Sequence, residues 1–328
     1  MTDERAFRRC GSSGLSLPPV SLGLWQNVGA DDPAETGRAI IRLAFDRGVT
    51  HFDLANNYGP PPGSAETAFG RILASDLKPF RDEMVISTKA GYRMWPGPYG
   101  DGGSRKYLLA SLDASLRRLG LDYVDIFYHH RPDPATPLAE TAGALAQAVR
   151  SGRALYVGIS NYPAPLALEM AQRLEALDTP CLIHQGRYSL LDQTAENGLL
   201  DALQAEGIGF AAFSPLAQGL LTDKYRQTAI PPDARMARGG TLPPERLTPA
   251  VRALLEGLAP IAQRRGQSLA QLALCWVLRD PAVTTAVVGA RTPEQLAELL
   301  DATSAGPLTD DDLQAIRAAG ATNGRTIT

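Results

Sequence analysis

The sequence predicts an α/β protein of the (β/α)8 TIM-barrel class with a short N-terminal β-hairpin. Short apolar segments alternate with segments of helical periodicity about eight times along the chain, which is the pattern of a barrel of parallel strands. Polar residues directly follow several of the apolar segments, as they do where barrel strands end at the active-site face. No G-x-G-x-x-G motif follows the first apolar segment, and this disfavours an open doubly wound sheet.

The individual elements follow from periodicity and from start and stop signals. Phe7–Leu17 alternates loosely around two glycines and predicts the hairpin. Ser104 is expected to be the N-cap of a helix that runs to Leu119. Residues 218–249 lack periodicity, and a loop of that length is expected to be functional or disordered. The strands are expected at 20–25, 50–55, 84–90, 123–130, 154–161, 181–189, 208–215 and 284–290, and the other helices at 33–48, 64–74, 138–150, after Pro163, and at 195–206, 250–265, 268–278, 292–300 and 310–319.

The composition is that of an ordinary globular protein. The 328 residues carry a net charge of −3 and are 44% hydrophobic, and we expect one domain over 1–328, with the hairpin in 1–19 and a flexible tail at 320–328. The sequence contains no basic patch of the kind that would predict nucleic-acid binding, and no apolar run approaches the ~20 residues that span a bilayer. The N-terminus has no apolar segment typical of a signal peptide, and three widely separated cysteines suit a reducing cytoplasm. Monomer and homo-oligomer both stay open.

Four polar residues that can act together follow three of the expected strands. Asp53 ends one strand, Tyr58 lies in the loop after it, and Lys89 and His130 end two further strands. Because parallel barrel strands direct their carboxyl ends to one face, we expect these side chains to meet there. For each residue alone a cap, a surface charge or a core role is the simpler interpretation, and only their combination favours a site.

The four residue types suit proton donation to a carbonyl oxygen. An ammonium beside a phenol lowers the phenol's pKa from its usual ~10, so we expect Lys89, paired with Asp53, to make Tyr58 more acidic. His130 is expected to donate a hydrogen bond to an oxygen beside Tyr58. None of the four is an obvious nucleophile, which predicts attack by a hydride from a nicotinamide or flavin. His129 is expected to point away from His130, and no metal site is expected because no carboxylate or thiolate ligand accompanies this pair.

These segments resemble the aldo-keto reductases over nearly the whole chain. HFDLANNYG, the lysine of STKAG and the final histidine of FYHHR match the Asp–Tyr–Lys–His tetrad of that superfamily in order and context. Within it, the chain resembles the branch of the potassium-channel β subunits and the bacterial L-glyceraldehyde 3-phosphate reductases, and GPPPGSAE and FSPLAQGLLTDKY look most like the second group. The resemblance implies an NADPH-dependent reductase of aldehydes and ketones, such as L-glyceraldehyde 3-phosphate or a related small aldehyde.

The resemblance also implies which residues hold NADPH. Arg291 stands where many relatives have serine, and a guanidinium can grip a 2′-phosphate through two hydrogen bonds, which favours NADPH over NADH. The implied contacts are Ser160, Asn161 and Gln185 at the nicotinamide amide, Phe213 stacked on its ring, Ser214, Leu216 and Gly219 at the pyrophosphate, Lys224 and Arg235 at the 2′-phosphate, and Gly289, Arg291, Gln295 and Glu298 at the adenosine end.

The substrate side is expected to have aromatic walls. Four aromatic residues are expected to line it: Trp25, Trp95, Tyr99 and Tyr188. Arg93, Arg131 and Arg187 are candidate cations for a substrate phosphate. Two alternatives stay open: a redox-sensing regulatory protein like the channel β subunits, and an NAD(P)-dependent sugar or alcohol dehydrogenase that uses the same site.

Overall fold

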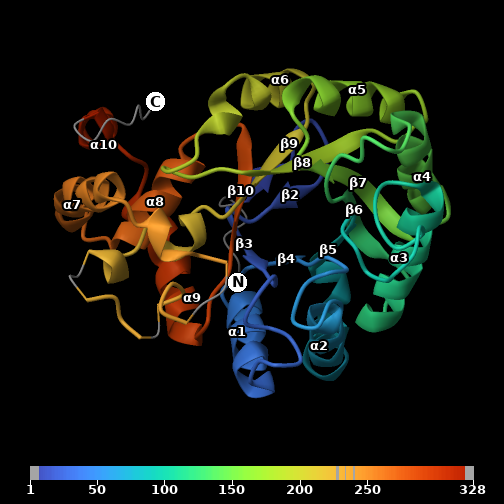
Figure 1. Cartoon of the computed structure of the whole chain (residues 1–328), viewed down its shortest axis with the longest axis horizontal. Helices are drawn as coiled ribbons and strands as arrows, with labels where there is room; N and C mark the ends of the chain where they lie inside the picture. The colour runs from blue at the N-terminus through green and yellow to red at the C-terminus, as the bar shows by residue number, and fades with distance from the viewer. Residues whose placement is uncertain (1–6, 227–228, 233, 239–240, 322–328) are drawn as a thin grey trace.

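Eight parallel strands form a closed barrel in the computed structural model, which describes residues 7–226, 229–232, 234–238 and 241–321 (Figure 1). Around the barrel the order is β10-β3-β4-β5-β6-β7-β8-β9. The strand bounds are β3 Val20–Gly23, β4 His51–Asp53, β5 Val85–Ala90, β6 Val124–His129, β7 Ala154–Ser160, β8 Cys181–Arg187, β9 Gly209–Phe213 and β10 Val283–Val288. The predicted (β/α)8 class is confirmed.

Helices surround the strands, as Figure 1 shows. Ser104 is the N-cap that the sequence predicts, because its hydroxyl accepts a hydrogen bond from the Tyr107 amide. The helix bounds are α1 Ala34–Asp46, α2 Ser64–Ile72, α3 Arg105–Leu119, α4 Leu138–Arg150, α5 Ala164–Glu175, α6 Leu199–Ala205, α7 Pro249–Arg264, α8 Leu269–Leu278, α9 Pro293–Leu300 and α10 Asp310–Ala321. No helix within these described residues combines the length and apolar character needed to cross a membrane.

The close packing of α2 against α3 requires a glycine at the contact. The Cβ of any larger residue at Gly70 in α2 would lie 2.5 Å from the Arg118 carbonyl oxygen at the end of α3. The adjacent Glu66, fully buried, accepts hydrogen bonds from Thr88 of β5 and from the Arg118 guanidinium. This contact ties α2 and α3 to the strand that carries Lys89.

The N-terminal hairpin closes the amino-terminal end of the barrel. Its strands β1 (Arg8–Arg9) and β2 (Ser16–Leu17) pair antiparallel, as predicted. The Ser12 amide donates to the Gly207 carbonyl oxygen just before β9, so the hairpin sits at the ends where the strands begin. Cys10 and Leu17 are fully buried there with the inward-facing Ile126 and Tyr128. The opposite end is left for the site.

Three segments differ from the sequence-based expectations. A continuous helix over 195–206 is wrong: a 3-10 turn at Thr194–Glu196 precedes α6, and Gly198, in the left-handed region, separates them. The expected tail begins too early, because Gly320 and Ala321 belong to α10; residues 322–328 lie outside the described residues. In its described residues, the long loop after β9 contains three short 3-10 turns, at Ala217–Gly219, Asp223–Tyr225 and Pro244–Arg246.

Candidate active site

The four predicted site residues meet at the carboxyl end of the barrel. Asp53 is the last residue of β4, Lys89 lies one residue before the end of β5, and His130 directly follows β6. Tyr58 lies in the loop after β4 and is held by turn hydrogen bonds, one of which runs from its amide to the Ala55 carbonyl oxygen. Parallel strands that end on one face explain the convergence.

A buried ion pair forms the floor of the site. Lys89 Nζ lies 2.6 Å from Asp53 Oδ2 and donates to the Leu54 carbonyl oxygen at 2.8 Å. Both side chains are excluded from solvent, with exposures of 0% and 2%. Burial lowers the pKa of Lys89, and the adjacent Asp53 carboxylate opposes that change. An ammonium buried in this way depends on its carboxylate partner to stay charged.

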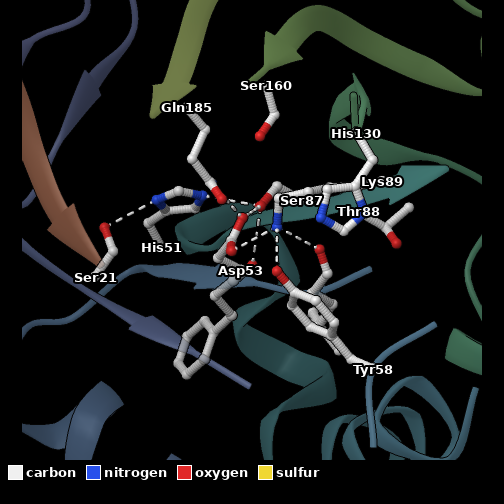
Figure 2. A network of polar contacts seen from close by, with 12 residues as sticks. Ser21, His51, Asp53, Tyr58, Ser87, Thr88, Lys89, His130, Ser160 and Gln185 are labelled. Carbon is white, nitrogen blue, oxygen red and sulfur yellow. Dashed lines mark hydrogen bonds and ion pairs between the residues drawn. The ribbon is translucent and has the colours of Figure 1, made fainter. Parts of the chain in front are cut away.

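The Tyr58 hydroxyl is directed at this ammonium, as Figure 2 shows, with 3.3 Å between Tyr58 Oη and Lys89 Nζ. The expectation that the pKa of the Tyr58 phenol is lowered is wrong. Burial, followed by the charge of Asp53, raises the pKa of Tyr58 well above its usual value. The phenol is therefore protonated at neutral pH. Because Lys89 donates to its oxygen, the phenol's own proton is free to point into the cavity.

His130 stands beside Tyr58 as a neutral imidazole. The two ring centroids are 5.8 Å apart in an edge arrangement. Burial and the nearby Lys89 charge lower the pKa of His130 well below its usual value. His129 points away, as predicted, and its Nδ1 lies 2.6 Å from the Tyr162 hydroxyl. No group of three or more metal-ligating side chains occurs in the described parts of the chain.

A cavity of about 580 Å³ opens above these residues. Asp53, Tyr58 and His130 line it, and Lys89 lies beneath its floor. Trp25 lines it too. The residues assigned to the cofactor by resemblance all line the same cavity: Ser160, Asn161, Gln185, Phe213, Ser214, Leu216, Gly219, Lys224, Arg235, Gly289, Arg291, Gln295 and Glu298.

Three predicted aromatic residues do not line the cavity. Tyr188 is fully buried behind β8, where its hydroxyl contacts Glu196 and Arg279. Trp95 packs against Tyr107 with 5.2 Å between the ring centroids. Tyr99 is 57% exposed and also lies outside the lining. The sequence predicts that these residues are near the loops, but not which way their rings turn.

Of the three arginines that are candidates to bind a substrate phosphate, the structure places only one in the cavity lining. Arg131 Nε donates to the Gly91 carbonyl oxygen and its Nη2 to Asp101, so both ends of its guanidinium are held. Arg93 is exposed and is not part of the lining. Arg187 lines the cavity, with its guanidinium over the Phe213 ring.

This arrangement agrees with comparison to known proteins. A model of the aldo/keto reductase family matches residues 19–321, nearly all of the chain. The chain belongs to the aldo/keto reductase family. It is 58% identical over 304 residues to the L-glyceraldehyde 3-phosphate reductase of Escherichia coli K12, covering 91% of this chain and 88% of that protein. It is 35% identical over 308 residues to a probable voltage-gated potassium channel subunit beta of Arabidopsis thaliana, covering 92% of each. The family and the named relative identify an oxidoreductase.

Sequence reasoning missed several residues of this aldo/keto reductase site. Tyr92 lines the cavity and packs edge-on against His130, with 4.7 Å between the ring centroids. Its backbone carbonyl oxygen accepts a hydrogen bond from the Tyr107 hydroxyl, which receives one from the Asn56 amide. Tyr92 follows a predicted strand by two residues, and that position was a usable signal. The Tyr107 and Asn56 contacts had no sequence signal because they join separate elements.

Proposed function

We propose that this protein is an NADPH-dependent reductase of small aldehydes or ketones in which Tyr58 is the general acid. The observation that carries the proposal is the buried chain from Asp53 through Lys89 to the Tyr58 hydroxyl at the floor of the cavity. A protonated phenol backed by an ammonium is a proton donor whose conjugate base is stabilised in place.

The cavity residues fit a dinucleotide phosphate. Gln185 Nε2 donates to Asp53 Oδ1 at 3.0 Å, and Asn161 Nδ2 donates to the His130 carbonyl oxygen at 3.0 Å, so amide groups lie next to the catalytic residues. The cationic side chains of Lys224, Arg235 and Arg291, which follow β9 and β10 in the chain, line the same cavity. Amides beside the catalytic residues suit a carboxamide, and cations elsewhere in the lining suit phosphates.

The loop after β9 supports the same assignment. Ser214, Ala217, Gln218 and Gly219 all have φ in the left-handed region, at 53°, 48°, 62° and 97°. Backbone of this kind is uncommon outside glycine and clusters where ligands are held. A Cβ at Gly219 would meet open space, so its backbone is accessible from the cavity. We therefore assign this loop to the pyrophosphate.

In the proposed reaction a bound reduced nicotinamide supplies the hydride. Tyr58 donates its proton to the carbonyl oxygen of the substrate as that oxygen becomes negative. Lys89 stabilises the resulting phenolate, and Asp53 keeps Lys89 charged and in place. His130, neutral and at the cavity wall, orients the carbonyl oxygen beside the phenol.

A triose phosphate is the substrate that we propose, on the basis of the 58% identical relative named for L-glyceraldehyde 3-phosphate. Arg187 is the cation for its phosphate, because it lines the cavity while Arg131 is held by Gly91 and Asp101. Within the described residues Arg187 forms an ion pair with Asp192, and the 3.8 Å between Arg187 Nε and Asp192 Oδ2 makes that pair a loose one.

Two measurements test the proposal. A fluorescence titration with NADPH and NADH measures cofactor binding, and the loss of NADPH absorbance measures turnover of an aldehyde series. We expect kcat/KM for glyceraldehyde 3-phosphate to exceed that for glyceraldehyde, and Arg187→Ala to remove most of the difference. A ratio near one would refute the phosphate assignment. NADPH binding without turnover of any aldehyde would instead favour a redox-sensing role like that of the channel subunits.

A further inference from the structure

A chain of buried polar side chains runs through the barrel beneath the ion pair, and the reaction proposed above does not use it. His51 of β4 is its centre: Nδ1 lies 2.8 Å from Ser21 Oγ, and Nε2 lies 3.1 Å from Ser87 Oγ. Ser21 Oγ lies 2.6 Å from Thr285 Oγ1, and Ser87 Oγ lies 2.8 Å from Asp53 Oδ1. All five side chains are buried, and Figure 2 shows most of this chain leading to Asp53.

The direction of every hydrogen bond follows from the carboxylate. An ionised carboxylate only accepts, so the Ser87 hydroxyl must donate to Asp53 Oδ1. Because the Ser87 hydroxyl proton is engaged in that hydrogen bond, Ser87 Oγ can only accept the hydrogen bond that His51 Nε2–H donates. A neutral imidazole protonated at Nε2 accepts at Nδ1, so Ser21 donates to it, and Thr285 in turn donates to Ser21.

We propose that His51 is a positioning residue, which together with Ser87, Ser21 and Thr285 directs a one-way series of donors at Asp53 and so keeps that carboxylate ionised and turned toward Lys89. The reverse arrangement would place two acceptor oxygens 2.8 Å apart with no proton between Ser87 and Asp53. His51 must stay neutral so that Nδ1 can accept a hydrogen bond while Nε2–H donates one. Burial lowers the pKa of His51 to about 4, which keeps it neutral at physiological pH.

The charged and titratable groups around Asp53 are few. Lys89 faces it from β5, Tyr58 from the following loop and Tyr128 from β6, while Glu66 of α2 acts on Lys89. Gln185, which also donates to Asp53 Oδ1, is uncharged, as are Ser21 and Thr285. Within this series of hydrogen bonds, His51 is the titratable member besides Asp53, and its neutral ring passes the direction set by Asp53 on to Ser21 and Thr285.

The first test needs no enzymatic activity. The chain has four histidines, so selective 15N-histidine labelling gives a simple spectrum, and the His51 signals are assigned by their loss in His51→Gln. We expect His51 to be neutral with the proton on Nε2 from pH 8 down to about pH 5, since its pKa is about 4. Ser87→Ala, which removes the acceptor of Nε2–H and the link to Asp53, should produce a mixture of tautomers, whereas Ser21→Ala should keep the Nε2–H form. An Nδ1–H tautomer or a charged ring in the wild type would overturn the proposal.

The second test is the pH profile of kcat, and it rests on the proposed reductase activity. Loss of one hydrogen bond to a carboxylate should move the acid limb up by about one pH unit in Ser87→Ala. His51→Phe should move it the same way by a smaller amount, while His51→Gln, whose side-chain amide can still donate to Ser87, should restore it. A limb that stays in place in Ser87→Ala and His51→Phe would overturn the proposal.

A matched control separates positioning from simple loss of stability. His184 of β8 is also a buried neutral imidazole, but it bonds the Tyr162 backbone carbonyl oxygen and is not in the chain to Asp53. His184→Gln should lower the unfolding temperature without moving the acid limb. If no aldehyde is reduced by the wild type, the proposed function fails, and the tautomer measurement alone decides the role of His51.

Discussion

Replacing Tyr58 with phenylalanine removes one oxygen from the site and isolates its contribution. In the structure that oxygen accepts one hydrogen bond, from Lys89 Nζ at 3.3 Å, whereas Lys89 keeps its contacts with Asp53 at 2.6 Å and Leu54 at 2.8 Å. Lys89 is therefore not left without acceptors. We expect the free energy of unfolding to change by no more than about 1 kcal/mol, the net value of one hydrogen bond.

The effect on turnover should be far larger. Loss of a general acid lowers kcat by a factor of about 10²–10⁴, which corresponds to about 2.7–5.4 kcal/mol in the activation barrier. The assay is single-turnover oxidation of prebound NADPH by an aldehyde, with fluorescence titration to show that NADPH still binds. Such a separation of stability, binding and rate is specific to a proton donor.

Tyr92→Phe is the matched control. Tyr92 lines the same cavity and its ring, which phenylalanine keeps, packs against His130. This variant should lose less than about tenfold in kcat, because its hydroxyl has no part in proton donation. If Tyr58→Phe also kept its turnover within tenfold of the wild type, the assignment of Tyr58 as the acid would be refuted.

Three further outcomes follow from the structure. Lys89→Met should abolish turnover and destabilise the fold by about 3–5 kcal/mol, because Asp53 would stay buried without its cation. Chemical denaturation measures the free energy of unfolding, and a loss below about 1 kcal/mol would contradict the prediction. Arg235→Ala should weaken the binding of NADPH at least tenfold more than the binding of NADH, as measured by fluorescence titration. The reason is that the Arg235 guanidinium lines the cavity and forms no ion pair with any residue in the described ranges. Equal losses for the two cofactors would count against the 2′-phosphate assignment. Burial lowers the pKa of His184 from 6.5 to about 4, so the folded protein loses stability as the pH falls from 6.5 to 4, by up to about 1.4 kcal/mol per pH unit. The free energy of unfolding in urea should therefore depend less on pH in His184→Gln over that range. An unchanged dependence of this free energy on pH would contradict the prediction.

The barrel and the convergence of the candidate site residues were predictable because both depend on local pattern. Apolar strands followed by polar residues give the alternation, and parallel strands bring their carboxyl ends to one face whatever the details of packing. Asp53, Lys89 and His130 could therefore be placed together from their positions relative to strands alone. The helix over 195–206 was predicted wrongly because Gly198 breaks it, and a glycine in a helical pattern does not by itself show whether the chain turns there.

Side-chain direction and protonation were decided only by the tertiary structure. Tyr188 and Trp95 follow strands or lie in loops near the site, yet their rings turn into the core because larger apolar contacts are available there. The sign of the Tyr58 pKa shift depended on how much water the surrounding protein excludes, which no neighbour in sequence reports. The chain through His51 joins four strands that are far apart in sequence, so its direction appears only once the barrel has closed and Asp53 has become the common acceptor.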